Sequence, residues 1–129
     1  IGNYTTPIDS DDFLARVLDT LKLSHVQVIG KIPKTVQNVA VCGGSGSDFA
    51  DLAFKRKVDV YLSAEIKHST AIWAQENDFC IIDGTHYATE KPAVNLLVEK
   101  LKESSTKENW KIEILQTETE HPPFVFINK

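Results

Sequence analysis

The sequence predicts an α/β fold, with a mostly parallel or mixed sheet flanked by helices. Short apolar runs typical of strands alternate with amphipathic runs typical of helices, and the connections between them are short. This alternation favours right-handed crossovers between parallel strands. With 129 residues, 42% hydrophobic and 25% charged, the chain can bury the core of one domain. We therefore expect a single α/β domain over residues 1–129.

The first elements follow from helix caps and from the spacing of apolar residues. Residues 1–7 are rich in turn formers, and we expect them to form an exposed lead-in. Ser10 has the properties of an N-cap, and the two aspartates after it suit the first turn of a helix. Apolar residues at helical spacing predict that this helix extends to about Leu23. The next two predicted elements are strands at 26–29 and 36–41.

The alternation continues through the second half of the sequence. Pro92 is expected in the first turn of its helix, where a missing N–H costs nothing. In residues 110–118, Ile112 and Ile114 alternate with charged residues, which is typical of a half-buried strand. The predicted elements are helix 49–56, strand 59–63, a helix ending at Glu76, strand 79–82, helix 92–101, a polar turn at 104–109, strand 110–118, and a terminal strand or extended tail at 124–127.

A glycine-rich stretch, Gly43 to Asp48, lies directly after a predicted strand and directly before a predicted helix. Such a stretch can cradle a phosphate group at a helix N-terminus. It can also be a tight strand-to-helix turn, because glycine adopts backbone conformations that other residues avoid. The stretch is neither G-x-G-x-x-G nor a Walker A loop, which needs a lysine. The sequence therefore favours the turn and leaves modest anion binding open.

His86 and Glu90 lie on either side of another strand-to-helix turn. His86 follows the predicted strand 79–82, and Glu90 comes at the start of the next predicted helix. An imidazole and a carboxylate in these positions can face one point, at the sheet edge where open α/β sheets bind ligands. Such a pair suits zinc, iron, manganese or nickel better than calcium. The alternative is that Glu90 only complements the helix dipole and His86 is a hydrogen-bonded turn residue.

Three predicted strand-to-helix loops open on the same edge of the sheet, at residues 43–48, 65–68 and 83–90. The middle loop adds Glu65 and His68 to the histidine and carboxylates of the third. Together the loops bring a glycine turn, two imidazoles and several carboxylates to one edge. Metal-assisted hydrolysis and general acid–base catalysis both require such a set.

The net charge and the cysteine content indicate which binding partners and which cellular compartment to expect for this protein. A formal net charge of −4 makes nucleic acid an unlikely partner. No apolar run is long enough to span a bilayer, and no signal peptide opens the sequence. Cys42 and Cys80 match no zinc motif and are expected to be reduced thiols in a cytoplasmic protein, with a buried disulfide as the alternative. Because the sequence begins at Ile1 and contains no methionine, we expect a processed or partial polypeptide.

Three segments, in this order, resemble a known family. They are VAVCGGSGSD at 39–48, DVYLSAEIKH at 59–68 and IDGTHYATE at 82–90. They are similar to the Nif-three-like dinuclear metal-centre family, whose members are often labelled GTP cyclohydrolase I type 2 homologues. The resemblance extends from about Ile1 to Phe126 and corresponds to the C-terminal half of a family member. It implies a two-repeat α/β protein, of which this chain is one α-β-(β-α)x3 repeat.

The resemblance also implies two divalent metal ions held between the halves. The family's G-H-x-x-x-E pattern carries its two ligands onto His86 and Glu90, while the remaining ligands come from the N-terminal half. Thr85 stands between Gly84 and His86, either as a one-residue insertion or as a variant of the glycine. In the middle segment, Glu65 and His68 match an acidic residue followed by a histidine, and are expected to contact substrate or transfer protons. Two ligands alone should hold a metal weakly.

As a function, the resemblance implies a metal-dependent hydrolase in which a metal-activated water attacks a nucleotide-like or other small substrate. The alternative is a non-catalytic binding or scaffold protein that the metal stabilises. A further alternative is a nucleotide-binding regulator that uses the loop at 43–48. The family resemblance also implies a homo-oligomer, as a ring-shaped hexamer.

Overall fold

The computed structural model describes residues 1–125 and 127. The chain divides into two compact units, Ile1–Glu90 and Lys91–Lys129. Among the residues described, no helix combines the length and apolar character that a bilayer crossing requires. Cys42 and Cys80 are both free thiols.

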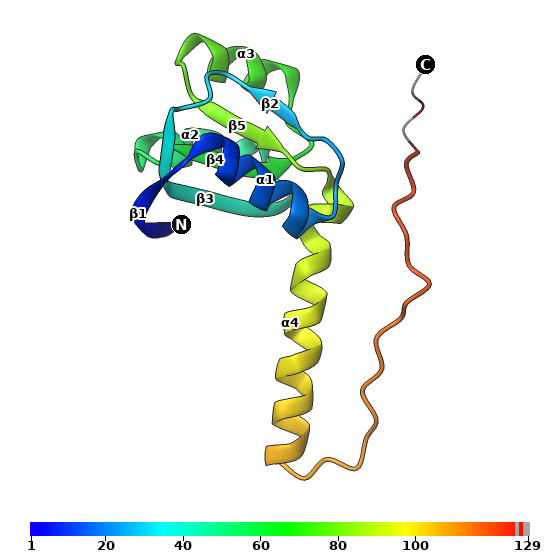
Figure 1. Cartoon of the computed structure of the whole chain (residues 1–129). Coiled ribbons are helices and arrows are strands. Elements are labelled where there is room, and N and C mark those ends of the chain that lie inside the picture. Colours follow the sequence, from blue (N-terminus) through cyan, green and yellow to red (C-terminus); the bar gives the residue numbers. More distant parts are fainter. Residues whose placement is uncertain (126, 128–129) are drawn as a thin grey trace. The chain divides into compact units, whose positions relative to one another are not determined.

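The first unit is built on a five-stranded mixed sheet (Figure 1). The parallel pairs β3–β4 and β4–β5 form its centre, and the two edge strands pair antiparallel with their neighbours. This arrangement confirms the predicted fold class. In spatial order the strands are β1 (Gly2–Asp9), β3 (Thr35–Ser45), β4 (Val60–Ala64), β5 (Cys80–Asp83) and β2 (Gln27–Ile29).

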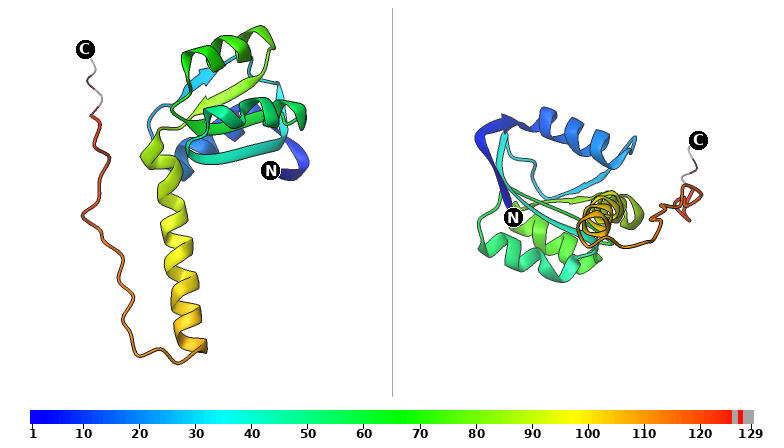
Figure 2. Two further views of the ribbon diagram at one scale, coloured as in Figure 1. Left: turned by 180° about the vertical axis from the view of Figure 1, so that it is seen from behind. Right: turned by 90° about the horizontal axis from the view of Figure 1, so that it is seen from below.

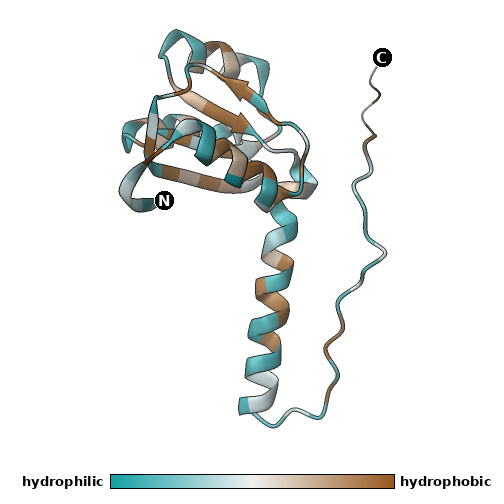
Figure 3. Ribbon diagram, in the orientation of Figure 1, coloured by the Kyte–Doolittle hydropathy of each residue, from teal (hydrophilic) through white to brown (hydrophobic). Residues whose placement is uncertain are grey.

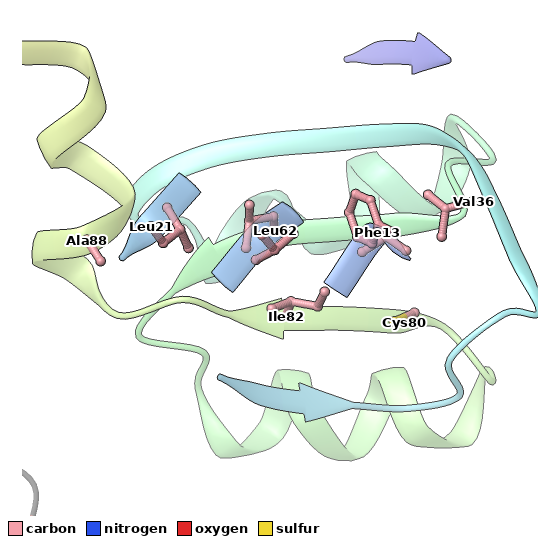
Figure 4. Packing of buried hydrophobic residues seen from close by; sticks show 9 residues of the cluster. Phe13, Leu21, Val36, Leu62, Cys80, Ile82 and Ala88 are labelled. Carbon is pink, nitrogen blue, oxygen red and sulfur yellow. The ribbon is translucent and has the colours of Figure 1, made fainter. Parts of the chain in front are cut away.

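Helices cover both faces of this sheet. Helix α1 (Ser10–Leu21) lies on one face, and α2 (Ala50–Lys55) and α3 (His68–Glu76) lie on the other (Figure 2). The apolar character of the central strands is visible in Figure 3. Because successive side chains of a strand point to opposite faces, strands β4 and β5 supply both cores. On the α1 face, Phe13, Val17 and Leu21 pack with Val36, Val60, Leu62, Cys80, Ile82 and Ala88 (Figure 4). On the other face, Ala50, Ala53 and Ala74 pack with Ala40, Val58, Tyr61, Phe79 and Ile81.

The cap of α1 differs from the prediction by one residue. Asp9, not Ser10, is the N-cap, and its carboxylate accepts a hydrogen bond from the Asp11 amide at 2.9 Å. Ser10 is buried, and its hydroxyl donates to the carbonyl of Pro33. This hydrogen bond therefore connects the start of α1 to the segment that precedes β3.

The predicted lead-in at residues 1–7 was wrong, because this segment belongs to strand β1. It pairs antiparallel with β3, from Gly2 opposite Val39 to Asp9 opposite Thr35. The polar sequence is explained by its place at the edge of the sheet, where most of its side chains face solvent. Its register shifts between Asn3 and Ile8, and an irregular edge strand of this kind tolerates Pro7.

The helix predicted from Pro92 to Leu101 is longer at both ends. Helix α4 covers His86–Lys107, so Pro92 lies inside it and not in the first turn. A proline at this position cannot donate to the carbonyl four residues earlier, that of Ala88. The helix also replaces most of the polar turn predicted at 104–109.

The strand predicted at residues 110–118 is absent from the described part of the chain, where this segment has no regular structure. A strand needs a neighbour for its backbone hydrogen bonds, and the described sheet contains only β1 to β5. Of the strand or tail predicted at 124–127, residues 124, 125 and 127 have no regular structure, and residue 126 lies outside the described residues.

Candidate metal centre

Three strand-to-helix connections meet at one edge of the sheet. They follow β3, β4 and β5, which are parallel neighbours, so their carboxyl ends lie side by side. The first connection is shorter than the predicted loop at 43–48, because β3 continues to Ser45 and a 3₁₀ turn, η1 (Ser47–Phe49), begins two residues later. Half of the predicted glycine-rich loop, residues 43–45, is therefore the end of a strand.

A left-handed backbone conformation occurs at the end of each of these strands. Its φ angles are 68° at Gly44, 51° at Glu65 and 63° at Thr85. For a residue with a side chain this conformation costs on the order of 1–3 kcal/mol, and a β-branched threonine rarely adopts it. Strained residues of this kind cluster at functional sites, where the surrounding structure holds them in place.

Glu65, His86 and Glu90 form one cluster at this edge. The Nδ1 atom of His86 lies 2.9 Å from Oε1 of Glu65, and its Nε2 atom lies 3.3 Å from Oε2 of Glu90. The three side chains are 42–57% exposed. The structure thus brings together three of the four predicted site residues and leaves a carboxylate on each ring nitrogen of His86.

The two carboxylates raise the pKa of His86 above its ordinary value of 6.5, and the hydrogen bond to Glu65 is the largest cause. In the imidazolium form, both nitrogens donate to a carboxylate. In the neutral form with its proton on Nδ1, Nε2 presents a lone pair toward Glu90. A cation between Nε2 and Glu90 satisfies both groups, so this donor set fits a divalent transition metal.

Gly44 lies directly against the side chains of His86 and Glu90. A Cβ atom at this position would lie 2.5 Å from Oε1 of Glu90 and 3.1 Å from Nε2 of His86. The left-handed φ of Gly44 also disfavours any other residue. The glycine-rich stretch therefore lets the backbone of β3 approach the histidine and the carboxylate closely.

Hydrogen bonds tie the three connections to one another. The hydroxyl of Thr89 accepts from the Gly44 amide at 3.0 Å, which links α4 to the end of β3. The hydroxyl of Ser63 donates to the Gly44 carbonyl at 3.2 Å, and the hydroxyl of Tyr61 donates to the Gly46 carbonyl at 2.7 Å. These contacts link β4 to the same strand end.

His68 lies apart from this cluster. It is the first residue of α3 and is exposed. Within residues 1–125 and 127, no hydrogen bond or ion pair joins it to Glu65, His86 or Glu90. In the same part of the chain, no group of three or more His, Cys, Asp or Glu side chains is arranged to hold a metal ion. Glu65 and Glu90 contact different nitrogens of the His86 ring, so one ion bound to a ring nitrogen meets only one of these two carboxylates.

Two cavities of the first unit are lined by residues outside the cluster. A cavity of about 680 Å³ lies near the amino ends of β4 and β5, and another of about 330 Å³ lies beside α2. Neither is lined by a residue of the cluster. The three side chains of the cluster are themselves partly exposed, which leaves them accessible to another polypeptide segment.

The protonation of His86 in the metal-free chain depends on its two carboxylate neighbours. We expect His86 to titrate above pH 6.5, and Glu65→Gln to lower its pKa, because the largest cause of the shift is removed. The stabilisation from the imidazolium is complete below pH 6.5 and is lost as the pH rises through the higher folded-state pKa. An NMR titration of the ring measures this pKa, with Glu76→Gln as a control, since Glu76 is an exposed glutamate at the C-terminal end of α3. A wild-type midpoint at or below 6.5 would contradict the prediction.

Most of the chain matches a known protein family. Residues 1–123 match the Duf34/NIF3 (NGG1p interacting factor 3) family. The chain belongs to this family. It is 32% identical over 100 residues to a GTP cyclohydrolase 1 type 2 homolog of Pasteurella multocida, covering 78% of this chain and 40% of that protein. A homolog of the same name from Streptomyces coelicolor is 30% identical over 127 residues, covering 96% of this chain and 45% of that protein.

The fold of the family is also present in solved structures. The crystal structure of Staphylococcus aureus protein SA1388 is similar, with a TM-score of 0.85 and 24% identity. That match covers 97% of this chain and 36% of the other. This chain of the Duf34/NIF3 family thus spans less than half the length of these relatives.

Within the predicted loops, the sequence did not single out Gly44, Asp83 and Thr89 as parts of the site. Their contacts depend on how closely the ends of β3, β4 and β5 approach one another, and no spacing along the chain reports this approach. The only signal for Gly44 was the glycine-rich composition around it, and such a composition is equally typical of a tight turn.

Proposed function

We propose that this chain supplies part of a dinuclear metal centre in a metal-dependent hydrolase, with His86 and Glu90 as metal ligands. The observation that carries the proposal is the approach of His86 Nε2 to Glu90 Oε2 at 3.3 Å, while Glu65 accepts the hydrogen bond from Nδ1. Zinc, iron, manganese and nickel suit this nitrogen and oxygen donor pair.

Each residue of the cluster has a separate task in this proposal. Glu65 holds the proton on Nδ1, so the lone pair of Nε2 is available and the ring keeps its orientation. Glu90 lies one helical turn after His86 and presents its carboxylate on the same face of α4. When bound, divalent ions would polarise a substrate and activate water for hydrolysis of a nucleotide-like or other small molecule. His68 is proposed to contact the substrate or transfer a proton.

Two ligands are too few for a tight site, so the other ligands must come from elsewhere. The relatives are more than twice as long as the matched region, which supports a second polypeptide segment as their source. The exposure of the cluster supports the same view. Self-association as a ring-shaped hexamer belongs to this proposal, and so does a reducing, cytoplasmic location, which suits the two free thiols.

The second candidate function is a non-catalytic scaffold in which the metal joins two polypeptide segments. The exposure of His86 and Glu90 favours it, because exposed ligands can link two polypeptide segments without binding a substrate. The two functions predict different numbers of protein ligands around the metal. A closed set of four protein ligands would indicate the scaffold, whereas an open position would indicate catalysis.

Metal binding itself tests both functions. Zn²⁺ titrated into the 129-residue chain is expected to shift the ring resonances of His86 in NMR spectra. His86→Ala or Glu90→Ala should weaken binding by more than about a hundredfold, because each removes one of the two donors, a larger loss than a change beside a ligand causes. His121→Ala is the control, because this exposed imidazole belongs to the second unit, where its Nδ1 atom lies 3.1 Å from the carbonyl of Thr119. Equal zinc affinity in wild type and His86→Ala, or no binding by wild type, would contradict the proposal.

A further inference from the structure

Asp83, the last residue of β5, connects two of the three site loops. Its Oδ1 atom accepts a hydrogen bond from the Thr85 amide, and its Oδ2 atom accepts one from the Ile66 amide, both at 3.0 Å. Each donor is the chain neighbour of a residue in the cluster: Ile66 follows Glu65, and Thr85 precedes His86. One carboxylate thereby contacts the backbone next to both partners of the hydrogen bond between Glu65 and His86.

The two loops that Asp83 contacts also contain the unfavourable backbone conformations. Glu65 and Thr85 both have positive φ angles, although neither is glycine. Such conformations persist only where surrounding interactions hold them. The contacts with a carboxylate are stronger than bonds between neutral groups, because the acceptor is charged. The Gly84 amide also donates to the Ser63 carbonyl at 2.9 Å, which links the end of β5 to the end of β4.

We infer that Asp83 is a positioning residue. It sets the orientation of His86 by fixing the backbone of the two loops that carry Glu65 and His86. Its carboxylate stabilises the left-handed turns that point the Glu65 carboxylate at Nδ1 of His86. The effect on metal affinity rests on the proposed function. The effect on the geometry of Glu65 and His86 does not, and it is measurable without metal.

Asp83→Asn is the test, because asparagine keeps the size of the side chain but has only one acceptor oxygen. Its NH₂ group must face one of the two backbone N–H groups. Asp59→Asn is the control for the loss of a carboxylate charge. Oδ2 of Asp59 accepts both backbone N–H groups, those of Gln37 and Asn38 at 2.8 and 2.7 Å, so the single acceptor oxygen of asparagine can keep both bonds. Asp59 lies before β4, at the opposite end of that strand from Glu65.

The first measurement uses metal-free protein. NMR of the wild type should show the His86 ring hydrogen-bonded at Nδ1, and coupling constants that report positive φ at Glu65 and Thr85. In Asp83→Asn these signatures should be lost or averaged, whereas Asp59→Asn should retain them. A loss of general stability alone would not change the ring signature of His86 in the folded population, so this readout separates positioning from stability.

The second measurement is the zinc titration of the same three proteins. Asp83→Asn is expected to weaken Zn²⁺ binding about tenfold to a hundredfold, as changes beside metal ligands do, and Asp59→Asn should leave it unchanged. Unaltered His86 and φ signatures in Asp83→Asn would overturn the inference, and so would equal weakening of zinc binding in both variants. If wild type binds no zinc, the proposed function fails, while the metal-free spectra still decide the role of Asp83.

Discussion

Gly44→Val is expected to abolish measurable metal binding, with a loss of more than about a hundredfold in affinity for Zn²⁺. A Cβ atom at Gly44 would lie 2.5 Å from Oε1 of Glu90 and 3.1 Å from Nε2 of His86, so both proposed ligands must move. A β-branched residue at a φ of 68° also carries backbone strain. We expect the free energy of unfolding to fall by about 1–3 kcal/mol for this reason alone.

Gly2→Val is the control for this variant, because nothing lies within 4 Å of a Cβ atom at Gly2. It should retain zinc affinity and most of the stability. Binding is measured by NMR titration, and unfolding by urea. Wild-type affinity in a folded Gly44→Val variant would show that the glycine has no role at the site.

Ile82→Ala is expected to reduce the free energy of unfolding by about 2–5 kcal/mol, because it leaves a cavity in the core. Ile82 is fully buried in β5 and packs in the cluster beneath α1. A loss of this size is a large share of the about 5–15 kcal/mol that stabilises a typical domain. Urea unfolding followed by circular dichroism measures the change.

Ile72→Ala is the matched control, since Ile72 lies on α3 with 43% of its surface exposed. It should change the free energy of unfolding by no more than about 0.5 kcal/mol, as exposed substitutions generally do. A loss below about 1 kcal/mol for Ile82→Ala would mean that this face of the sheet is not the main core.

The central part of the fold could be predicted from the sequence, because its elements have strong local patterns. The strands at 36–41, 59–63 and 79–82 are apolar runs, and they correspond to the buried centre of the sheet. Strand β1 was missed because an edge strand has no such pattern. The start of α4 was placed too late, at Pro92, because proline is usually found in a first turn.

Residues 110–118 have the sequence pattern of a strand but form no strand in the described part of the chain. Alternating apolar and charged residues indicate that a segment can form a half-buried strand. They do not supply the neighbouring strand with which it must pair, and the described residues provide none. A periodic pattern therefore predicts a strand only where a partner is present.

The candidate site was predictable to the extent that it depends on local spacing. Residues four apart on a helix lie on one face, so the pairing of His86 with Glu90 follows from their positions. Glu65 was identified as a site residue, but its contact with Nδ1 of His86 depends on the pairing of β4 with β5. Whether His68 takes part in catalysis stays a prediction, as do the metal ions themselves.

Hydrogen bonds between the three loops hold the cluster in place. Asp83, Thr89 and Ser63 connect the loops entirely through residues of the first unit. The loops are thus ordered before any further ligand arrives, and little conformational entropy remains to be lost on binding. A partner that brought the remaining ligands of the proposed centre would meet a preorganised surface, so its affinity would depend on its own contacts and not on remodelling this chain.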